Sequence, residues 1–231
     1  MPNEESRRCG SVLDAVSSST DRRRPLFARF YARIAERMES EGLAELREEL
    51  LTGLQGRVVE VGPGNGMNFG HSPAGVQEVF AVEPEPYLRG LAGTAAALAA
   101  VPVVVRSGSA ESLPLPDGSV DAGVLCLVLC SISDRAGALA ELARVIRPGG
   151  ELRFLEHCIA ETAGLRRVQR IADATLWPLL AGGCHTATDP LADIVAAGFE
   201  ITGVRRLRFP EQRITVPASP HVLGTARSRR Q

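Results

Sequence analysis

The sequence predicts an α/β fold, a doubly wound sheet of seven strands that is mostly parallel, with one antiparallel C-terminal strand and helices on both faces. Short apolar runs alternate with longer amphipathic segments along most of the chain, which is typical of strand–helix–strand units in a parallel sheet. The first apolar run ends in the glycine-rich stretch VVEVGPGNG (58–66). In open α/β sheets a ligand binds beyond the carboxyl ends of the strands, so this turn predicts the position of a site.

The expected strands are apolar runs bounded by turn residues. The run at 120–130 is apolar on both faces, as a central parallel strand should be. The last two runs are expected to pair antiparallel. The predicted strands are 57–62, 76–83, 101–108, 120–130, 151–157, 199–209 and 220–227.

The expected helices carry apolar residues at helical spacing and have recognisable ends. Pro148-Gly149-Gly150 stops one helix. Pro190 occupies the first turn of another, and Gly198 follows its end. A short crossover helix is expected between the first two strands. The other predicted helices are 25–39, 41–51, 88–100, 134–147, 164–180 and 189–198.

Composition and charge exclude several classes of function. The net charge of −1 gives no electrostatic reason to expect a nucleic-acid partner. All 26 basic residues are arginine, which excludes a lysine Schiff base and a P-loop lysine. The cysteines are odd in number and form no CxxC pair, so they predict a reduced chain rather than a disulfide framework. Without a signal peptide or an apolar run long enough to span a membrane, a cytoplasmic protein is expected.

The glycine turn does not match the common phosphate-binding patterns. Its spacing is Glu60-x-Gly62-x-Gly64-x-Gly66. A dinucleotide site requires GxGxxG, but the sixth position counted from Gly62 is Met67. A P-loop would end in GK[ST], which this chain lacks. The turn therefore argues against NAD and ATP.

Two carboxylates end the first two predicted strands. Glu60 would repel a pyrophosphate and suits a ligand with a cationic end. Glu83 ends the second strand, where a carboxylate can accept both hydroxyls of a ribose. An amino group, a close backbone approach and a ribose are all features of S-adenosylmethionine. This cofactor therefore fits the two acids and the turn between them.

These residues resemble the class I S-adenosylmethionine-dependent methyltransferases, which have a Rossmann-like fold. The resemblance covers 55–160 through four blocks in order, VVEVGPGNG, VFAVEPEPYL, GSAESLPLPDGSVD and LARVIRPGGELRFLEH. It implies that Glu60 orders the amino group and that Glu83 accepts the ribose hydroxyls. Ser109 replaces the aspartate that many members carry beside the adenine, and Glu111 is alternatively a surface helix cap. The cofactor-binding residues that the resemblance implies are Glu60, Gly62, Gly64, Gly66, Glu83, Pro84, Ser109, Ala110, Glu111, Cys126 and Leu127.

The domain organisation follows from length and from this resemblance. A chain of 231 residues favours one domain with extra elements. We expect a disordered tail over 1–24 and a single methyltransferase domain over 25–231. Within it lie N-terminal helices (25–54), a cofactor-binding core (55–160), and helices and last strands on the acceptor side (161–231).

The acceptor side resembles the small thiol S-methyltransferase branch of the methyltransferase-like proteins. The resemblance lies in VLCSI (128–132), FLEHCIA (154–160), GGCHTATD (182–189) and PHVLGTA (220–226). It implies methyl transfer to a small, apolar thiol. The alternatives are O- or C-methylation of a quinone, phenol or lipid-like acceptor and, from another class, a non-catalytic scaffold that only binds the cofactor.

A thiol acceptor suggests a role for His157, which follows the fifth predicted strand. The thiolate is the nucleophile, and a free thiol has a pKa of about 8.5. A histidine that titrates near neutral pH could take the thiol proton, so His157 is the candidate catalytic residue. Alternatively, it only fixes a loop. His185, in a glycine-containing turn, is a second candidate for the acceptor pocket.

Aromatic and cysteine side chains complete the predicted acceptor pocket. Phe27 and Tyr31, one turn apart on the first helix, either cover this pocket or belong to the core. Cys130 ends the fourth predicted strand and is expected in the pocket. A further hypothesis is that Cys130, Cys158 and Cys184 converge on a thiophilic substrate such as trivalent arsenic, whereas the alternative is ordinary core cysteines. No resident metal is predicted.

Overall fold

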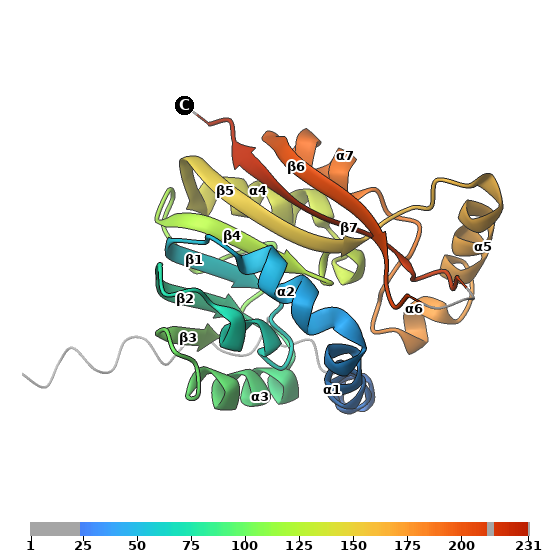
Figure 1. The fold of residues 1–231 in the computed structure, drawn as a ribbon, viewed down its shortest axis with the longest axis horizontal. Coiled ribbons are helices and arrows are strands. Elements are labelled where there is room, and N and C mark those ends of the chain that lie inside the picture. Colours follow the sequence, from blue (N-terminus) through green and yellow to red (C-terminus); the bar gives the residue numbers. More distant parts are fainter. Residues whose placement is uncertain (1–23, 212–214, 231) are drawn as a thin grey trace, which may run out of the picture.

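The structure, a computed structural model, describes residues 24–211 and 215–230. These residues form a seven-stranded sheet with the order β3-β2-β1-β4-β5-β7-β6 (Figure 1). All of the predicted tail except Arg24 lies outside the described residues. The strands are β1 (Gly56–Val61), β2 (Val76–Val82), β3 (Val103–Arg106), β4 (Val120–Cys126), β5 (Ile146–His157), β6 (Phe199–Arg208) and β7 (Pro220–Ser228).

Strand direction confirms the predicted sheet. β1 pairs parallel with β2 and β4, β2 with β3, and β4 with β5. Only β7 runs against its neighbours, because it pairs antiparallel with both β5 and β6. The strand order reverses between β1 and β4, so the switch point that binds ligands in such sheets lies at the carboxyl ends of these two strands.

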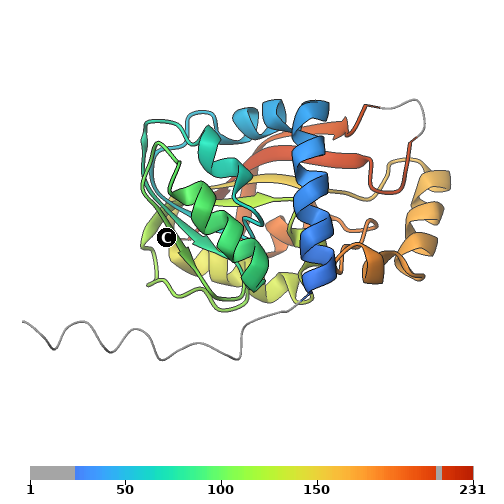
Figure 2. The ribbon, with the colours of Figure 1, turned by 90° about the horizontal axis from the view of Figure 1, so that it is seen from below.

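The helices cover both faces of the sheet, as predicted (Figures 1 and 2). One apolar core joins the sheet to α4 and α7, and another joins its opposite face to α2 and α3. The helices are α1 (Pro25–Met38), α2 (Ala44–Leu51), α3 (Pro86–Ala96), α4 (Arg135–Val145), α5 (Ala163–Asp173), α6 (Trp177–Leu180) and α7 (Pro190–Ala196), with a π-turn η2 (Glu39–Leu43) and 3₁₀ turns η3 (Met67–His71) and η4 (Leu129–Ser131).

The helix α1 lies beyond the carboxyl ends of β1 and β2, across that edge of the sheet (Figures 1 and 2). The helices α5 and α6 project from the same end of the molecule, beside the end of β5 (Figure 1). The segment after β4 is also there, because η4 follows that strand directly. These segments surround the edge at which the sheet switches direction.

Several predicted boundaries were wrong. The strand predicted at 120–130 ends at Cys126, because Leu127 has a φ of 57° and turns the chain out of the sheet. The helix predicted at 164–180 is interrupted, with α5 ending at Asp173 and α6 beginning at Trp177. A proline at the second position of α6 lacks the N–H that a continuous helix would need.

Two further elements differ from the prediction. The crossover between β1 and β2 is the 3₁₀ turn η3, rather than an α-helix. Beyond α4 the chain enters β5 at Ile146, five residues before the predicted start, because Ile146 already pairs with Val120. Pro148-Gly149-Gly150 therefore lies within an irregular first part of β5, where the register shifts.

In the described part of the chain, no helix combines the length and the apolar character that crossing a membrane requires.

Candidate active site

The glycine turn after β1 adopts a backbone that requires glycine. Gly62, Gly64 and Gly66 have φ values of 62°, 60° and 83°, in the left-handed region that other residues rarely adopt. A Cβ at Gly62 would lie 2.3 Å from Cγ2 of Val128. A Cβ at Gly64 would lie 2.9 Å from Cε1 of Tyr31. The turn therefore lets Val128 and Tyr31 pack directly on its backbone, where a side chain on either glycine would collide with them.

A cleft opens at the carboxyl ends of β1, β2 and β4, at the switch point of the sheet. It brings together most of the predicted cofactor residues and the two aromatic residues of α1. The predicted residues that line it are Phe27, Tyr31, Gly62, Gly64, Glu83, Pro84, Ser109, Ala110, Glu111 and Leu127. Glu60, Gly66, Cys126, Cys130, His157 and His185 are absent from its lining.

Glu83 is the buried carboxylate of this cleft. Its Oε2 accepts a hydrogen bond of 3.0 Å from the Gly64 N–H, and its Oε1 accepts one of 2.9 Å from the Glu85 N–H. Burial raises the pKa of Glu83 to about 7, although these two N–H groups oppose the shift. A carboxylate has about four lone-pair sites, so Glu83 keeps acceptor capacity for two hydroxyls. Its geometry is consistent with the predicted ribose contact.

Glu60 lies beneath the glycine turn, outside the cleft lining, in a buried polar network. Nδ2 of Asn68 donates to Oε1 of Glu60 over 2.7 Å, and Arg47 donates to Oδ1 of Asn68 over 2.8 Å. Burial raises the pKa of Glu60 to about 7, while the Asn68 hydrogen bond and the Arg47 charge lower it. The network holds the turn from below, and its hydrogen bond and positive charge partly offset the effect of burial on the pKa of Glu60.

Sequence reasoning missed two buried residues beneath the site, Arg47 and Asn68, and did not single out the lining residues Val128, Ser131, Ile132 and Gly182. Arg47 is only 5% exposed, and its guanidinium also donates to Oε1 of Glu39 over 2.7 Å and contacts Sγ of Cys126 at 3.2 Å. One signal was available, because Arg47 lies in a helix of otherwise alanine, leucine and glutamate residues, between Leu46 and Leu50 on its apolar face. An arginine so close to that face predicts a buried partner.

The end of β4 forms the floor of the cleft. Leu127 lines it with a φ of 57°, a strained conformation for a residue other than glycine. Its N–H donates to the Leu155 carbonyl over 2.8 Å, which keeps the chain attached to β5 as it turns. Cys126 lies behind the floor, and burial raises the pKa of its thiol to about 11. We therefore place Cys126 in support of the cleft rather than in contact with a ligand.

The loop after β3 supplies another wall of the cleft. Ser109 and Ala110 line the cleft, and Ser109 forms an isolated antiparallel bridge with Ser112. Glu111 also lines it. The loop is fixed to α4, because the Leu113 N–H donates to Oε2 of Glu141 over 2.8 Å. This wall lies where the resemblance implies the adenine.

The helix α1 covers the cleft from outside. The rings of Phe27 and Tyr31 stack with centroids 5.8 Å apart, and both line the cleft. Tyr31 packs on Gly64, and Phe27 packs on Gly182, where a Cβ would lie 2.3 Å from its ring. Burial raises the pKa of Tyr31 to about 12, so its hydroxyl stays protonated at physiological pH. The sequence left open whether Phe27 and Tyr31 cover the pocket or belong to the core, and their position in the cleft lining favours a cover.

His157 lies at the end of β5, outside the cleft lining. Its Nδ1 lies 2.9 Å from the Ala218 carbonyl, and its ring lies 4.4 Å from that of His221. Burial lowers the pKa of His157 to about 3, with the neighbouring His221 as the second cause. A general base for a thiol should titrate near the operating pH. His157 therefore does not have the near-neutral pKa that a general base for the thiol needs.

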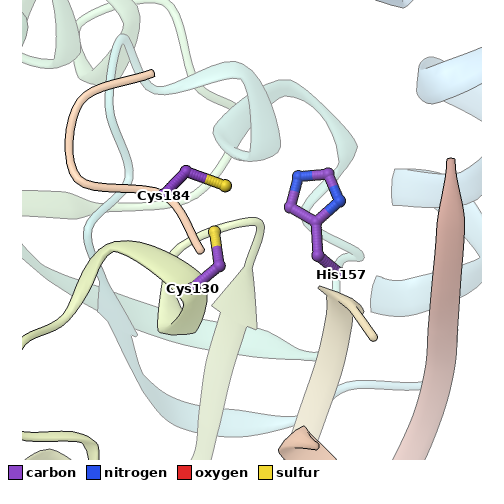
Figure 3. A group of neighbouring side chains, drawn as sticks. All are labelled: Cys130, His157 and Cys184. Atoms are coloured by element: carbon purple, nitrogen blue, oxygen red, sulfur yellow. The ribbon is translucent and has the colours of Figure 1, made fainter. Parts of the chain in front are cut away.

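The three predicted cysteines do not converge. Cys158 follows His157 but lies apart from the other two, with its Sγ 3.9 Å from a guanidinium nitrogen of Arg206. Cys130 and Cys184 do meet, and their partner is His157 (Figure 3). The hydrogen-bonded neighbour Cys184, together with burial, raises the pKa of the Cys130 thiol. The hypothesis of a trivalent-arsenic substrate required three thiols together, and the structure brings only two of them together.

His185 follows Cys184 in the turn after α6, but the structure places the His185 side chain on the surface. Its Nδ1 lies 2.9 Å from the Gly183 carbonyl, and its N–H donates to the Cys130 carbonyl over 2.9 Å. The backbone of His185 therefore connects two site-forming loops, whereas its side chain is absent from the cleft lining.

Comparisons with known proteins identify the class. The family described as "Methyltransferase domain" matches residues 59–154, which contain the second half of β1, the glycine turn and β4. Among solved structures, geranyl diphosphate methyltransferase in complex with SAM has a TM-score of 0.62 at 16% identity, over 81% of this chain and 84% of that one. The fold and the site together define an S-adenosylmethionine-dependent methyltransferase of the class I, Rossmann-like type.

Curated relatives identify the family more closely. The chain is 34% identical to human Thiol S-methyltransferase TMT1B over 76% of this chain and 73% of that protein. It is 32% identical to human Thiol S-methyltransferase TMT1A, over 81% and 80% respectively. At this identity and coverage, the chain belongs to the methyltransferase family that contains these two proteins.

The residues of the cleft fit the cofactor of this class. Glu83 presents a buried carboxylate with spare lone pairs just after β2, and Gly62 and Gly64 line the same cleft without side chains. The turn and Glu60 would hold the methionine end, Glu83 the ribose, and Ser109 and Ala110 the adenine. S-adenosylmethionine supplies a methyl group on a sulfonium, which is a good leaving group. The chain itself then has to position and activate the acceptor.

Proposed function

We propose that this protein transfers the methyl group of S-adenosylmethionine to the sulfur of a small, apolar thiol. The observation that carries the proposal is the similarity to relatives named thiol S-methyltransferases, at 31–34% identity over 73–84% of their length. This range of coverage includes α5, α6 and the turn at Cys184, beyond the cofactor core. The similarity therefore extends to the segments that would form the acceptor side.

The cleft supports an apolar acceptor. Around its mouth lie Phe27, Val128 and Ile132, none of which offers a polar side-chain atom. Such walls bury an aliphatic or aromatic thiol and exclude water, and each methylene that they bury contributes about 0.8 kcal/mol. Tyr31 is the one lining phenol, and it stays protonated because burial raises its pKa to about 12. We propose that Phe27 and Tyr31 position the acceptor against the glycine turn.

In the proposed reaction, the thiol loses its proton and its sulfur attacks the methyl carbon in line with the leaving group. One sulfur–carbon bond forms and the sulfonium–methyl bond breaks, which gives a methyl thioether and S-adenosylhomocysteine. Holding the two sulfurs in line is the main contribution of the protein, and such orientation supplies about 7–11 kcal/mol in well-aligned systems.

A screen of acceptors tests the proposal. The full chain is incubated with S-adenosylmethionine and matched pairs of acceptors, an alkyl or aryl thiol against the corresponding alcohol or phenol, with S-adenosylhomocysteine release as the readout. We expect release with the thiols at least about 10-fold faster than with the oxygen analogues, because the thiolate is the better nucleophile at neutral pH. Faster release with phenols or quinols would contradict the proposal and favour O- or C-methylation.

The carbon- or oxygen-directed alternative is supported by two shorter similarities. Over 110 residues, 45% of this chain, the chain is 36% identical to a Serratia marcescens protein named as an O-methyltransferase. A 62-residue stretch, 27% of this chain, is 42% identical to a Methylobacterium nodulans protein named Ubiquinone/menaquinone biosynthesis C-methyltransferase UbiE. Both similarities cover less than half of the chain, whereas the thiol-methyltransferase relatives match more than three quarters of it. We therefore rank the thiol first. The cytoplasmic location and the absence of a nucleic-acid partner stay predictions from composition.

A further inference from the structure

Three side chains from distant parts of the sequence meet beside the cleft. Cys130 belongs to η4 after β4, His157 ends β5, and Cys184 lies in the turn after α6. Their ligand atoms, the two sulfurs and one imidazole nitrogen, all lie within 4.8 Å of one another. Figure 3 shows the two sulfurs facing each other and one nitrogen of the His157 ring directed towards them.

The chemistry of this set is that of a soft or borderline cation site. Two cysteines and one histidine are ligands that zinc prefers, and a set of three protein ligands leaves a fourth position open, as in catalytic zinc sites. Bond lengths of about 2.3 Å to sulfur and about 2.0 Å to nitrogen place tetrahedral ligand atoms about 3.3–3.8 Å apart. The observed upper limit of 4.8 Å needs a closure of about 1 Å, which small side-chain rotations provide.

The histidine is oriented as a ligand. Nδ1 of His157 lies 2.9 Å from the Ala218 carbonyl oxygen, so this nitrogen carries the proton and donates it. The tautomer leaves Nε2 with its lone pair free. A backbone carbonyl that receives the other ring N–H is the usual outer partner of a metal-binding histidine, because it fixes both the tautomer and the ring orientation.

Each loop that carries a cysteine is held by a carboxylate side chain, fully buried for Glu156 and half-buried for Asp173. Glu156, next to His157, accepts the N–H groups of Val128 and Leu129 at 3.1 Å and so fixes the turn that carries Cys130. On the other side, Asp173 accepts the N–H of Thr186 at 2.7 Å and that of Ala187 at 2.9 Å. These contacts fix the segment that follows Cys184. The two thiols are therefore presented to the histidine by anchored backbone.

The group adjoins the methyl-transfer cleft. Ser131, the residue after Cys130, lines the cleft, and so does Gly182, two residues before Cys184. Both cysteines are buried, at 3% and 7% exposed. The group therefore lies next to the part of the cleft lining that Ser131 and Gly182 form.

We propose that Cys130, His157 and Cys184 bind one soft divalent cation, with zinc as the reference ion, and that its open fourth position takes the sulfur of the acceptor thiol. This proposal rests on the proposed thiol methylation. It gives His157 the role of a ligand in place of a base. The two thiolates and the dication balance in charge, so the occupied site adds no net charge to a buried position.

The cation would supply the activation that the described residues of the cleft lack. A thiol bound to a divalent cation is deprotonated outright, and its proton leaves to solvent. The bound sulfur then attacks the methyl carbon, a sulfur–carbon bond forms, and the sulfonium–methyl bond breaks. The product is a neutral thioether, a weaker ligand than a thiolate, so it leaves and the fourth position is again free. No oxidant or reductant is needed.

Cobalt(II) is the direct probe, because it takes tetrahedral zinc sites and reports thiolate ligands through near-ultraviolet charge-transfer absorption. The full chain, reduced and freed of metal with a chelator, is titrated with cobalt(II). We expect one cobalt per chain with thiolate charge-transfer and tetrahedral visible bands, which zinc then removes. We expect Cys130→Ser and Cys184→Ser to weaken cobalt binding by more than about 100-fold, beyond the effect of losing an outer-shell partner.

Cys158→Ser is the matched control. Cys158 is equally buried, at 4% exposed, and adjoins His157 in sequence, but its sulfur belongs to a different neighbourhood. We expect its cobalt spectrum to match that of the unmodified chain. Binding of S-adenosylmethionine by each variant, measured by calorimetry, shows that the variant is folded. Three outcomes would overturn the proposal. They are equal losses of cobalt affinity in Cys158→Ser and Cys130→Ser, a cobalt spectrum without a thiolate band, and a Cys130–Cys184 disulfide that persists under reducing conditions.

The fourth position is tested by adding acceptors to the cobalt form. A thiol should shift the charge-transfer bands, and its oxygen analogue should not. An unchanged spectrum with every thiol would overturn the open-position part of the proposal. This readout needs no methyl transfer, so it is distinct from the release assay. If the cobalt bands and the thiol-induced shift appear but no thiol releases S-adenosylhomocysteine, the proposed function fails while the cation site stands.

Discussion

The cofactor side and the acceptor side of the cleft are built in different ways. The cofactor side consists of short continuous stretches, in which the turn from Gly62 to Gly66 and the strand end at Glu83 each carry their function within a few residues. The acceptor side is assembled from α1, η4, the end of β5 and the turn after α6, which are distant in sequence. We therefore propose that a methyl acceptor is recognised by long-range packing and the cofactor by local backbone shape.

The buried network beneath the turn gives the largest expected effect. Arg47→Ala leaves the Glu60–Asn68 pair without its cation and removes the bond to Glu39. Breaking a buried charged network of this kind costs about 3–5 kcal/mol, measured as the free energy of unfolding in urea.

The control for Arg47 is Arg37→Ala, which removes an exposed i,i+4 pair with Glu41, whose side chains are 76% and 30% exposed. We expect it to cost about 0.5 kcal/mol or less. Equal losses for the two variants would show that the cofactor side does not depend on the network.

The glycine turn comes next. Gly62→Ala adds a Cβ at a φ of 62° and 2.3 Å from Cγ2 of Val128. Left-handed backbone costs about 1–2 kcal/mol for alanine, and overpacking adds about 1–3 kcal/mol. We expect a loss of stability of about 2–5 kcal/mol, and weaker binding of S-adenosylmethionine by calorimetry.

Gly70→Ala is the matched control, because it lies in η3 with no atom within 4 Å of an added Cβ. It should leave both stability and cofactor binding nearly unchanged. A Gly62→Ala variant that binds S-adenosylmethionine normally would remove the close backbone approach from the description of this side.

The carboxylate at the end of β2 is expected to have a smaller effect. Glu83→Ala removes an acceptor of two backbone N–H groups and the predicted partner of the ribose. We expect S-adenosylmethionine to bind about 10-fold more weakly, the scale of a lost hydrogen bond to a charged group. Glu78→Ala, on the same strand but facing Arg57 at 3.7 Å, should leave the dissociation constant unchanged.

The smallest expected effect is the pH dependence of the cofactor side. Burial raises the pKa values of Glu60 and Glu83 from 4.5 to about 7. In the ligand-free protein these acids hold protons that the unfolded chain has released, so stability falls as pH rises from about 4.5 to 7. Cofactor binding should show the opposite slope, because the charged carboxylates are the binding form, and affinity should rise several-fold through about pH 7.

Glu60→Gln isolates one of the two groups. A glutamine side chain cannot titrate, so the free energy of unfolding should depend less steeply on pH. Urea unfolding at several pH values measures this dependence. An unchanged slope would mean that the carboxyl of Glu60 is not the group that takes up the proton.

The same contrast explains what the sequence could reveal. The sheet, its single antiparallel strand and the position of the cleft were predictable because VVEVGPGNG and the acid at Glu83 carry local signals of strand, turn and charge. The boundary at Cys126 was not predictable, because the apolar run continues to Cys130 and the turn depends on the left-handed backbone of Leu127. Propensity does not reveal where a residue other than glycine accepts such strain.

The acceptor side was the least predictable part. Cys130 and Cys184 are 54 positions apart with no spacing signal, and they meet only because η4, β5 and the turn after α6 pack at one edge of the sheet. From the sequence, Cys158 was as good a candidate as these two cysteines, but its sulfur lies beside Arg206 instead. Arg47 gave a weak signal, as a charged residue close to the apolar face of its helix, but its partner Asn68 lies in a turn that was expected to be helical.

The most direct measurement is a crystal structure of the full chain with S-adenosylhomocysteine. We predict the ribose hydroxyls on Glu83, the amino-acid end over Gly62 and Gly64, and the thioether sulfur directed towards the wall that carries Ser131. A nucleoside bound outside this cleft, or inside it without a contact to Glu83, would contradict the assignment of the cofactor side.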